Sequence, residues 1–403
     1  YSSAASDVYK RQEGNNMKKR NLLFLALPIL SLLPTTSCAT YSLVVFNWGE
    51  YIDMDRVRQF EDEHNCRINY ITADSNENLL SKLDTTYFDI CFPSEYAIEE
   101  LAKKDMIRPI DYSRIPNLNI EEDLVPSLKS ALDNLKQDTL GKEGFDLLKY
   151  AIPYTWGLIG LLYDTTKISP EEIEADGWEA LRKTKNADGT DRKVVMYDTA
   201  RDVLSVALVA QGKDFVEVSD EDLELGVNWL KGQTKTINTL AYKTEEILDD
   251  MPNKKYDICF TYIGDAIYSM TSVLDDEGEN DYEHYAFYIP ESIGPTRSDI
   301  YVDAMCMAKN SKNEELAYEF LNFMNEHDVL YDNSIYTGYT SPIQTIYDEI
   351  TSEYSEYEEG PGSFYDVADT YRIVATDKDR FYRYDPELKT KLEEAWIDVK
   401  FDL

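Results

Sequence analysis

The stretch Val45-Phe46-Asn47-Trp48-Gly49-Glu50-Tyr51 decides the expected fold. Its first residues predict a short buried strand, and the next ones place a Trp, a carboxylate and a Tyr at the carboxyl end of that strand. In open α/β sheets ligands bind at this end of the strands, and ring faces and carboxylates both attract positive charge. The stretch therefore predicts an α/β protein that binds an organic cation, provided that neighbouring strand ends supply matching side chains.

The residues around this stretch alternate between strand and helix patterns. Asp53 is placed to cap the helix that follows the first strand, because a side-chain oxygen there can accept from the free N–H groups of the first turn. Alternation at this spacing indicates right-handed βαβ units and a parallel sheet. Strands are expected at 43–46, 67–71 and 88–92, with further helices at 76–83 and 96–104.

The alternation breaks at residues 150–163, where two strand-like runs follow one another without a helix between them. This break predicts the crossing from one domain to a second. A strand at 300–308 is expected to return to the first domain, before an amphipathic helix at 313–326. The second domain is expected to contain strands at 194–197 and 257–262 and helices at 200–211 and 220–231.

The N-terminal residues have the pattern of an export signal. Met17-Lys18-Lys19-Arg20 is a positive segment, residues 21–33 are apolar but too few to span a bilayer stably, and small residues lead to Cys38. We therefore expect residues 17–37 to be a lipoprotein signal peptide and Cys38 to carry the lipid. Ordinary cleavage that releases a free protein is the alternative, and residues 1–16 are interpreted as vector or upstream sequence.

Composition excludes several classes of function. The net charge of −37 repels nucleic acid and anionic headgroups, although an acidic surface can also serve solubility alone. With only three His and no zinc-type spacing of Cys and His, we expect no metal, no cofactor and no catalytic residues. The remaining cysteines lie in apolar runs and are predicted to be small buried side chains, with disulfides left open: Cys66, Cys91, Cys259 and Cys306.

The same side-chain types recur at other strand ends. An aromatic beside a strand is usually part of the core, and an Asp before a helix is usually its N-cap, so each position alone is a weak signal. Their repetition in both halves of the chain favours one cation site. The candidates are Trp48, Glu50 and Tyr51; Ser94 and Tyr96; Asp198, Thr199 and Asp202; Tyr262; Tyr301 and Asp303; and Tyr339.

At these residues the chain resembles the spermidine/putrescine-binding components of polyamine ABC transporters, which are periplasmic proteins or lipoproteins. The resemblance covers about residues 42–403, and several motifs in a fixed order are more specific than any one. They are Phe46-Asn47-Trp48-x-Glu50-Tyr51, Tyr87-Phe88-Asp89-Ile90, Pro93-Ser94-x-Tyr96, Ile152-Pro153-Tyr154-x-Trp156-Gly157, Asp198-x-Ala200-Arg201-Asp202, Val302-Asp303 and Gly338-Tyr339-x-x-Pro342.

The resemblance implies a two-lobed periplasmic-binding-protein fold of type II, with a mixed, mostly parallel sheet flanked by helices in each lobe. Lobe 1 would comprise residues 41–154 and 302–341, and lobe 2 residues 155–301 and 342–403. The ligand would lie in the cleft between the lobes. Partners would be a polyamine and the membrane permease, and the protein would be an exported, membrane-anchored monomer facing the periplasm or the extracellular space.

The resemblance also assigns roles. An aromatic box would be formed by Trp48, Tyr96, Tyr262, Tyr301 and Tyr339. The ammonium groups would meet Asp202 and Asp303, and further hydrogen bonds would come from Tyr51 and Ser94. An ammonium has three donors that need acceptors, and the methylene chain between two amines packs on rings.

Departures from the family pattern at four positions bear on the ligand. Two of them are Tyr262 and Tyr301, where the family commonly has Trp. Gly49 replaces a hydroxyl residue, and Thr199 stands where many members carry an Asp. Asp198 either compensates for that missing Asp or caps the following helix. A weaker inner-amine site would favour a diamine such as putrescine, or another organic cation. A secreted hydrolase that uses paired carboxylates such as Asp202 and Asp303 is a third alternative, but no nucleophile motif supports it.

Overall fold

The computed structural model describes residues 42–137, 143–355 and 365–401. The predicted leading segment 1–16, the signal peptide 17–37 and the lipidation site Cys38 lie outside the described residues. Residues 41–403 form one compact unit, so the lobe boundaries given above stay a prediction.

The first part of the chain builds one half of the sheet, as the alternating pattern predicts. Strand β1 (Leu43–Trp48) pairs in parallel with β2 (Ile68–Ala73) and β3 (Ile90–Cys91). The connecting helices are α2 (Met54–Glu63), α3 (Asn76–Leu83) and α4 (Glu95–Lys103). Asp53 caps α2, because its side chain accepts from the backbone N–H of Asp55 at 2.8 Å, and this prediction is confirmed.

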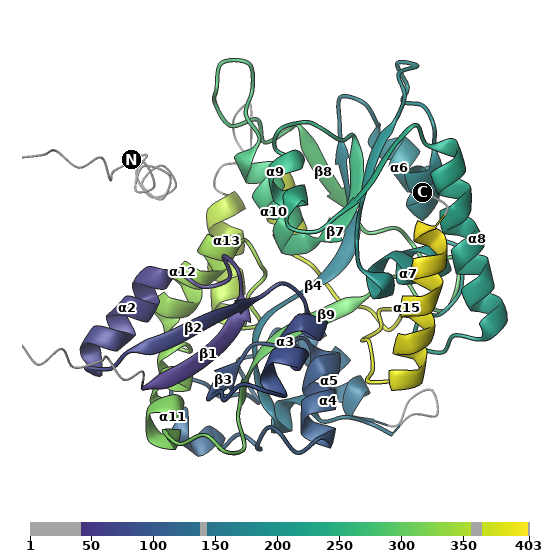
Figure 1. Ribbon diagram of the computed structural model, residues 1–403. Coiled ribbons are helices and arrows are strands. Elements are labelled where there is room, and N and C mark those ends of the chain that lie inside the picture. Colours follow the sequence, from purple (N-terminus) through teal and green to yellow (C-terminus); the bar gives the residue numbers. More distant parts are fainter. Residues whose placement is uncertain (1–41, 138–142, 356–364, 402–403) are drawn as a thin grey trace, which may run out of the picture. The chain divides into compact units, whose positions relative to one another are not determined.

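A single long strand joins the two halves of the sheet (Figure 1). Strand β4 (Ala151–Asp164) is buried along its whole length and contains both of the expected runs, with a register shift against β9 between Pro153 and Thr155. Its first part pairs with β9 (Ile300–Met307) and its last part with β7 (Ile258–Tyr262), in both cases antiparallel. These antiparallel pairings in the centre make the sheet mixed, with strand order β2-β1-β3-β9-β4-β7-β5-β6.

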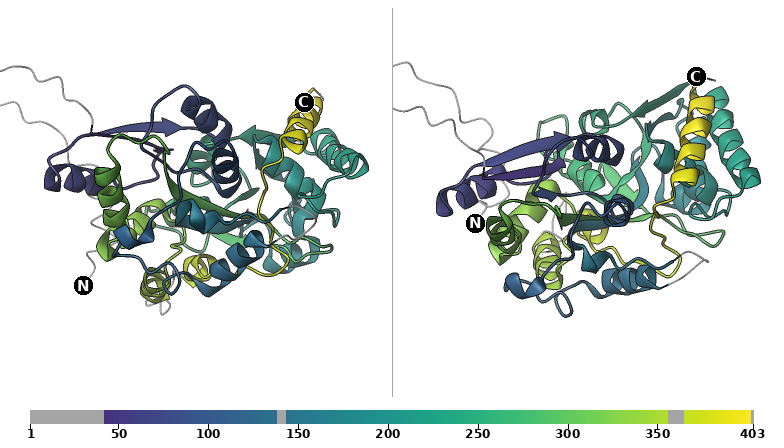
Figure 2. Two further views of the ribbon diagram at one scale, coloured as in Figure 1. Left: turned by 90° about the horizontal axis from the view of Figure 1, so that it is seen from below. Right: turned by 60° about the horizontal axis from the view of Figure 1, so that its bottom comes forward.

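The second half of the sheet repeats the parallel arrangement. Strand β5 (Lys193–Tyr197) lies between β6 (Thr239–Lys243) and β7, and β8 (Tyr285–Tyr288) adds to β4. Strand β6 was not predicted from the sequence, because its residues are only partly buried and carry no clear apolar pattern. The C-terminal helix α15 (Pro386–Lys400) packs on α7 (Ala200–Val209) and α8 (Asp220–Thr236), as Figures 1 and 2 show.

The remaining helices surround the sheet. They are α5 (Pro126–Lys136), α6 (Pro170–Asp176), α9 (Glu246–Asp250), α10 (Ile263–Ser272), α11 (Glu314–Phe323), α12 (His327–Thr337), α13 (Gln344–Ser355) and α14 (Tyr365–Tyr371), with short 3-10 turns at Tyr112–Arg114, Leu147–Lys149 and Gly177–Arg182. No helix in the described part of the chain is both long and apolar enough to cross a bilayer.

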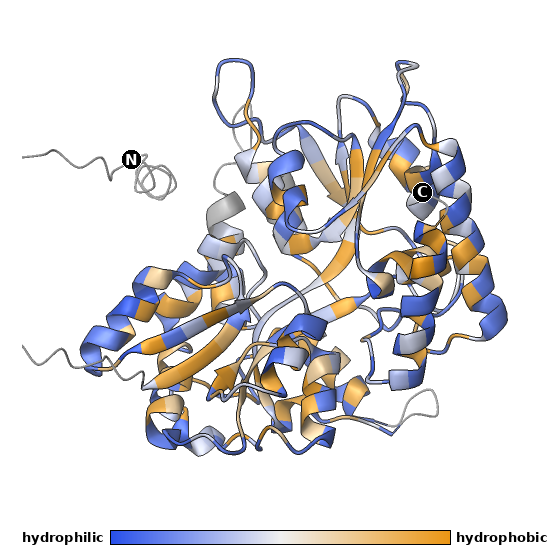
Figure 3. Ribbon diagram, in the orientation of Figure 1, coloured by the Kyte–Doolittle hydropathy of each residue, from blue (hydrophilic) through white to orange (hydrophobic). Residues whose placement is uncertain are grey.

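The core lies along the strands and the helix faces turned toward them, where Figure 3 shows the hydrophobic residues. Each large apolar side chain that is fully buried, such as Phe46 or Phe260, contributes about 2 kcal/mol from removal of its surface from water. All four described cysteines are buried and free, which confirms that they serve as small core residues.

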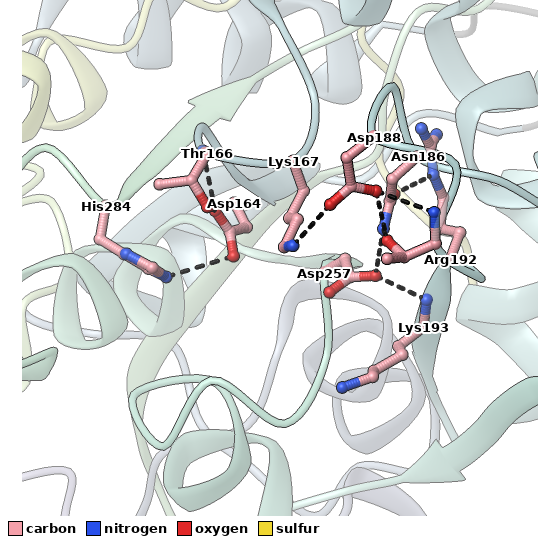
Figure 4. A network of polar contacts seen from close by, with 10 residues as sticks. Asp164, Thr166, Lys167, Asn186, Asp188, Arg192, Lys193, Asp257 and His284 are labelled. Atoms are coloured by element: carbon pink, nitrogen blue, oxygen red, sulfur yellow. Dashed lines mark hydrogen bonds and ion pairs between the residues drawn. The ribbon is translucent and has the colours of Figure 1, made fainter.

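A polar network stabilises the outer end of the second sheet half (Figure 4). Arg192 is fully buried, and its guanidinium donates to Asn186 Oδ1 at 3.0 Å and to Glu172 Oε1 at 2.6 Å. Asn186 in turn donates to Asp257 at 2.8 Å, which also accepts the backbone N–H of Lys193. These contacts pair the buried polar groups with one another, so this network has a structural role.

Candidate solute-binding site

Asp303, on β9, is the first of three buried carboxylates. Its Oδ2 accepts from the Tyr51 hydroxyl at 2.7 Å, and its Oδ1 accepts from Ser94 Oγ at 2.6 Å. Ser94 is the N-cap of α4 and forms an isolated bridge with Asp303, so the residues before α4 meet β9 directly. The structure thus brings together three residues that the sequence assigned to one site.

Burial raises the pKa of Asp303 to about 6, against the opposing effect of hydrogen bonds from Ser94 and Tyr51 and of the nearby Trp48 indole. Among the described residues, the Trp48 indole N–H is buried without a hydrogen-bond partner. Trp48 therefore lies near a carboxylate that is costly to ionise. An ammonium group that reached Asp303 would offset part of this cost.

Asp202, in the first turn of α7, is the second buried carboxylate. Its Oδ2 accepts from Thr199 Oγ1 at 2.5 Å and from the Tyr262 hydroxyl at 2.7 Å. Thr199 is the N-cap of α7, so its hydroxyl supports the helix and Asp202 together. Burial raises the pKa of Asp202, although both hydroxyl donors act in the opposite direction.

Asp265, in the first turn of α10, is the third buried carboxylate, and sequence reasoning missed it. It accepts from the Tyr339 hydroxyl at 2.7 Å and from the Tyr197 hydroxyl. Burial again raises its pKa. The available signal was its place three residues after Tyr262, at the start of a helix that follows a strand end, where side chains three apart share a face.

Tyrosine rings connect the three carboxylates. Ring centroids lie 5.1 Å apart for Tyr51 and Tyr339, 6.1 Å for Tyr339 and Tyr301, and 5.1 Å for Tyr301 and Tyr262, all edge to face. This row needs space at Gly264, because a Cβ there would lie 2.0 Å from the Tyr339 ring. The row gives an apolar wall between Asp303 at one end and Asp202 at the other.

The three carboxylates of this cluster form no ion pair with a Lys, Arg or His of the described residues, although the nearby Arg201 guanidinium favours the ionised form of Asp202. Within the described residues, every side-chain hydrogen bond that they accept comes from a hydroxyl group. Buried carboxylates are normally paired with a cation. The described part of the chain contains no group of three or more His, Cys, Asp or Glu suited to a metal ion. The arrangement is therefore suited to ammonium groups joined by an apolar chain.

Three residues predicted from the sequence lie elsewhere or have other partners. Glu50 is exposed, has a φ of 46° and accepts from Tyr336, so it does not join the buried carboxylates. The ring of Tyr96 is already covered by the guanidinium of Arg201 at 3.5 Å. The alternative that Asp198 caps the helix is wrong, because Thr199 is the N-cap. Asp198 accepts from Trp396 and Lys400, and its role in place of the missing Asp stays a prediction.

A family model described as bacterial extracellular solute-binding protein matches residues 55–361. The chain belongs to this family. Among its relatives, the putrescine-binding periplasmic protein PotF of Escherichia coli is 25% identical over 372 residues, which cover 91% of this solute-binding protein and 93% of PotF. The spermidine/putrescine-binding periplasmic protein of Salmonella typhimurium is 24% identical over 332 residues, with 81% and 85% covered.

Solved structures agree with the fold. The spermidine/putrescine ABC transporter substrate-binding protein PotD of Streptococcus pneumoniae has a TM-score of 0.64 and 26% identity, covering 90% of this solute-binding protein and 99% of PotD. The TpPotD lipoprotein of Treponema pallidum has a TM-score of 0.66 at 18% identity, with 89% and 99% covered. The predicted two-lobed binding-protein fold is thus confirmed.

Proposed function

We propose that this solute-binding protein captures a polyamine, putrescine or spermidine, and delivers it to the permease of an ABC importer. It would act outside the cytoplasmic membrane as a monomer, held there by lipid on Cys38. It binds the amine without converting it. The relatives named for putrescine and spermidine support the ligand class, and the family supports the extracellular or periplasmic location.

One observation carries the ligand class: three buried carboxylates share a row of tyrosine rings and form no ion pair with a cationic side chain of the described residues. A cation on a desolvated ring gains about 2 kcal/mol, and a buried charge that loses its partner costs about 3–5 kcal/mol. The carboxylates should therefore dominate affinity, and the rings should select the apolar chain between the amines. Asp265 joins Asp202 and Asp303 as a proposed ammonium ligand.

Isothermal titration calorimetry with residues 39–403 tests the proposal. The ligands are putrescine, cadaverine, spermidine and spermine, with butylamine and 1,4-butanediol as the monocationic and neutral controls. We expect at least one polyamine to bind about 100-fold more tightly than butylamine, because a second ammonium gains a second buried carboxylate. Failure of all four polyamines to bind would overturn the proposal.

Single substitutions then test the site. Asp202→Asn and Asp265→Asn should each weaken polyamine binding by about 100-fold, since each removes one buried charge partner. Asp198→Asn is the matched control, because Asp198 is bound by Trp396 outside the cluster. Equal affinity of Asp265→Asn and Asp198→Asn would remove Asp265 from the site. Recovery of unchanged amine after prolonged incubation, measured by NMR, would exclude turnover.

A further inference from the structure

The Arg201 side chain, in the first turn of α7, is enclosed by two tyrosine rings. Its Cζ lies 3.5 Å from the ring centroid of Tyr96 and 4.9 Å from that of Tyr382. The two rings are themselves edge to face at 6.2 Å. Only 15% of the Arg201 side chain is exposed, so the guanidinium is largely desolvated. A cation in such a setting interacts strongly with ring faces.

Carboxylates of several elements interact electrostatically with the same guanidinium. Arg201 Nη2 lies 3.5 Å from Glu77 Oε1, in the first turn of α3. Glu95 and Asp299 are both buried, and Arg201 favours the ionised form of each. Among the described residues, Asp299 Oδ1 has no hydrogen-bond partner. Arg201 is therefore a nearby positive charge for Glu95 and Asp299, and it also favours the ionised form of Asp202 in the ligand cluster.

These partners come from opposite halves of the sheet. Helix α7 follows β5 in the second half, whereas Glu77 and Tyr96 lie on α3 and α4, which belong with β1–β3 in the first half (Figure 1). The backbone is fixed as well, since the Tyr382 hydroxyl donates to the Arg201 carbonyl at 2.8 Å. The contacts of Arg201 with Glu77 and Tyr96 thus form only when the two halves are close together.

The neighbour of Arg201 in the chain connects these contacts to the site. Asp202, one of the three buried carboxylates, is the next residue on the same helical turn. Any movement that separates Arg201 from Tyr96 also moves Asp202 away from the residues of the first half, Asp303 with Ser94 and Tyr51. Tyr96 acts on the ligand only through Arg201 in this arrangement, because the guanidinium covers its ring.

We propose that Arg201, with Tyr96, Tyr382 and Glu77, is a latch that holds the two halves of the binding protein together around the ligand. We refer to these four residues as the Arg201 latch. Arg201 is a positioning residue that need not touch the ligand. The proposal rests on the proposed function. It adds that the Arg201 latch determines how long the two halves stay together around the ligand.

Stopped-flow and calorimetric measurements with putrescine test the latch. Arg201→Met, which keeps the apolar stem and removes the charge, should weaken binding about 10-fold, with the change in the dissociation rate rather than the association rate. Arg201→Lys should restore part of this loss, because it keeps the charge but not the planar stack. Glu77→Gln and Tyr96→Leu should each have a smaller effect, and neither should add to Arg201→Met.

Asp332→Asn is the matched control, because its ion pair with Arg56 at 2.5 Å joins α2 and α12 away from the latch. It should leave the dissociation rate unchanged. Small-angle scattering of each variant, with and without putrescine, reports closure directly. The latch predicts a larger radius of gyration for Arg201→Met than for the unchanged protein.

The outcomes separate the two proposals. Binding of putrescine with a dissociation rate that Arg201→Met does not change would overturn the latch and leave the proposed function intact. If the unchanged protein binds none of the four polyamines, the proposed function fails. In that case the scattering of the ligand-free proteins decides the latch, and equal radii for the unchanged protein and Arg201→Met would overturn it.

Discussion

Asp303 makes polyamine binding depend on pH in a way that follows from its burial. Its pKa is raised from 3.8 to about 6, which corresponds to about 3 kcal/mol against the ionised form in the ligand-free protein. Because the folded pKa lies above the unfolded one, the contribution of this group to stability is complete below pH 4. It is lost as the pH rises through about 6.

An ammonium ligand needs the ionised carboxylate, so binding has the opposite dependence. About nine-tenths of Asp303 is ionised at pH 7 and about one-tenth at pH 5, and the affinity for putrescine should fall at least about 10-fold over this interval. Both amines of putrescine stay charged throughout. Asp202 and Asp265 have raised pKa values too, so they can only steepen the change.

The assay is calorimetry at pH 5, 6, 7 and 8 in two buffers of different ionisation enthalpy, which together give the affinity and the protons released. The unchanged protein should release protons on binding below about pH 6. Asp303→Asn should lose about 100-fold in affinity at pH 7 and also lose the part of the pH profile centred near 6. Asp198→Asn should keep the profile, since Asp198 is bound by Lys400 and Trp396 outside the cluster.

Two results would refute this reasoning. A flat affinity between pH 5 and pH 7 in the unchanged protein would mean that the carboxylate is not a ligand or is already ionised at pH 5. An Asp303→Asn variant with the same pH profile as the unchanged protein would assign the titration to another group.

Three further predictions concern single side chains. Gly264→Ala should displace Tyr339, because the new Cβ would lie 2.0 Å from its ring, and should weaken putrescine binding more than 10-fold by calorimetry. Arg192→Met should lower the free energy of unfolding by about 3 kcal/mol in urea titrations, since it leaves Glu172 without its partner. Thr199→Ala should lower the free energy of unfolding by about 1 kcal/mol through the lost N-cap. It should also weaken amine binding, because Asp202 loses a hydrogen-bond donor. An unchanged affinity would mean that Thr199 only caps the helix.

Much of the fold could be predicted because it depends on local patterns. The helix expected at 76–83 is found at Asn76–Leu83, and the strand expected at 300–308 is found at Ile300–Met307. Strand β6 escaped prediction because edge strands with few buried residues have weak patterns. The two runs at 150–163 lie on one strand, and Gly157 within it leaves room for the Tyr301 hydroxyl, because a Cβ there would lie 2.2 Å from that oxygen.

The candidate site was predicted only in part, because contacts between residues distant in the chain leave no local pattern. The pairs Tyr51–Asp303 and Ser94–Asp303 join residues that the sequence had selected as strand-end side chains, and the structure brings them together. Asp265 was missed because an Asp is common in the first turn of a helix, where it interacts favourably with the helix dipole. Its position alone therefore does not indicate a ligand site. Its partners Tyr197 and Tyr339 are far away in sequence.

The sequence by itself determined which side chains stand at strand ends and helix starts, because hydrophobic periodicity and capping are read over a few neighbouring residues. Only the tertiary structure decided what those side chains meet. Asp198 and Asp202 lie on one short turn, yet the first binds Trp396 of α15 and the second joins the tyrosine cluster. Tyr96 likewise has an aromatic face suited to a ligand cation, and the packing of α7 places Arg201 on it instead. Such choices depend on contacts between elements distant in the chain, which no local pattern contains.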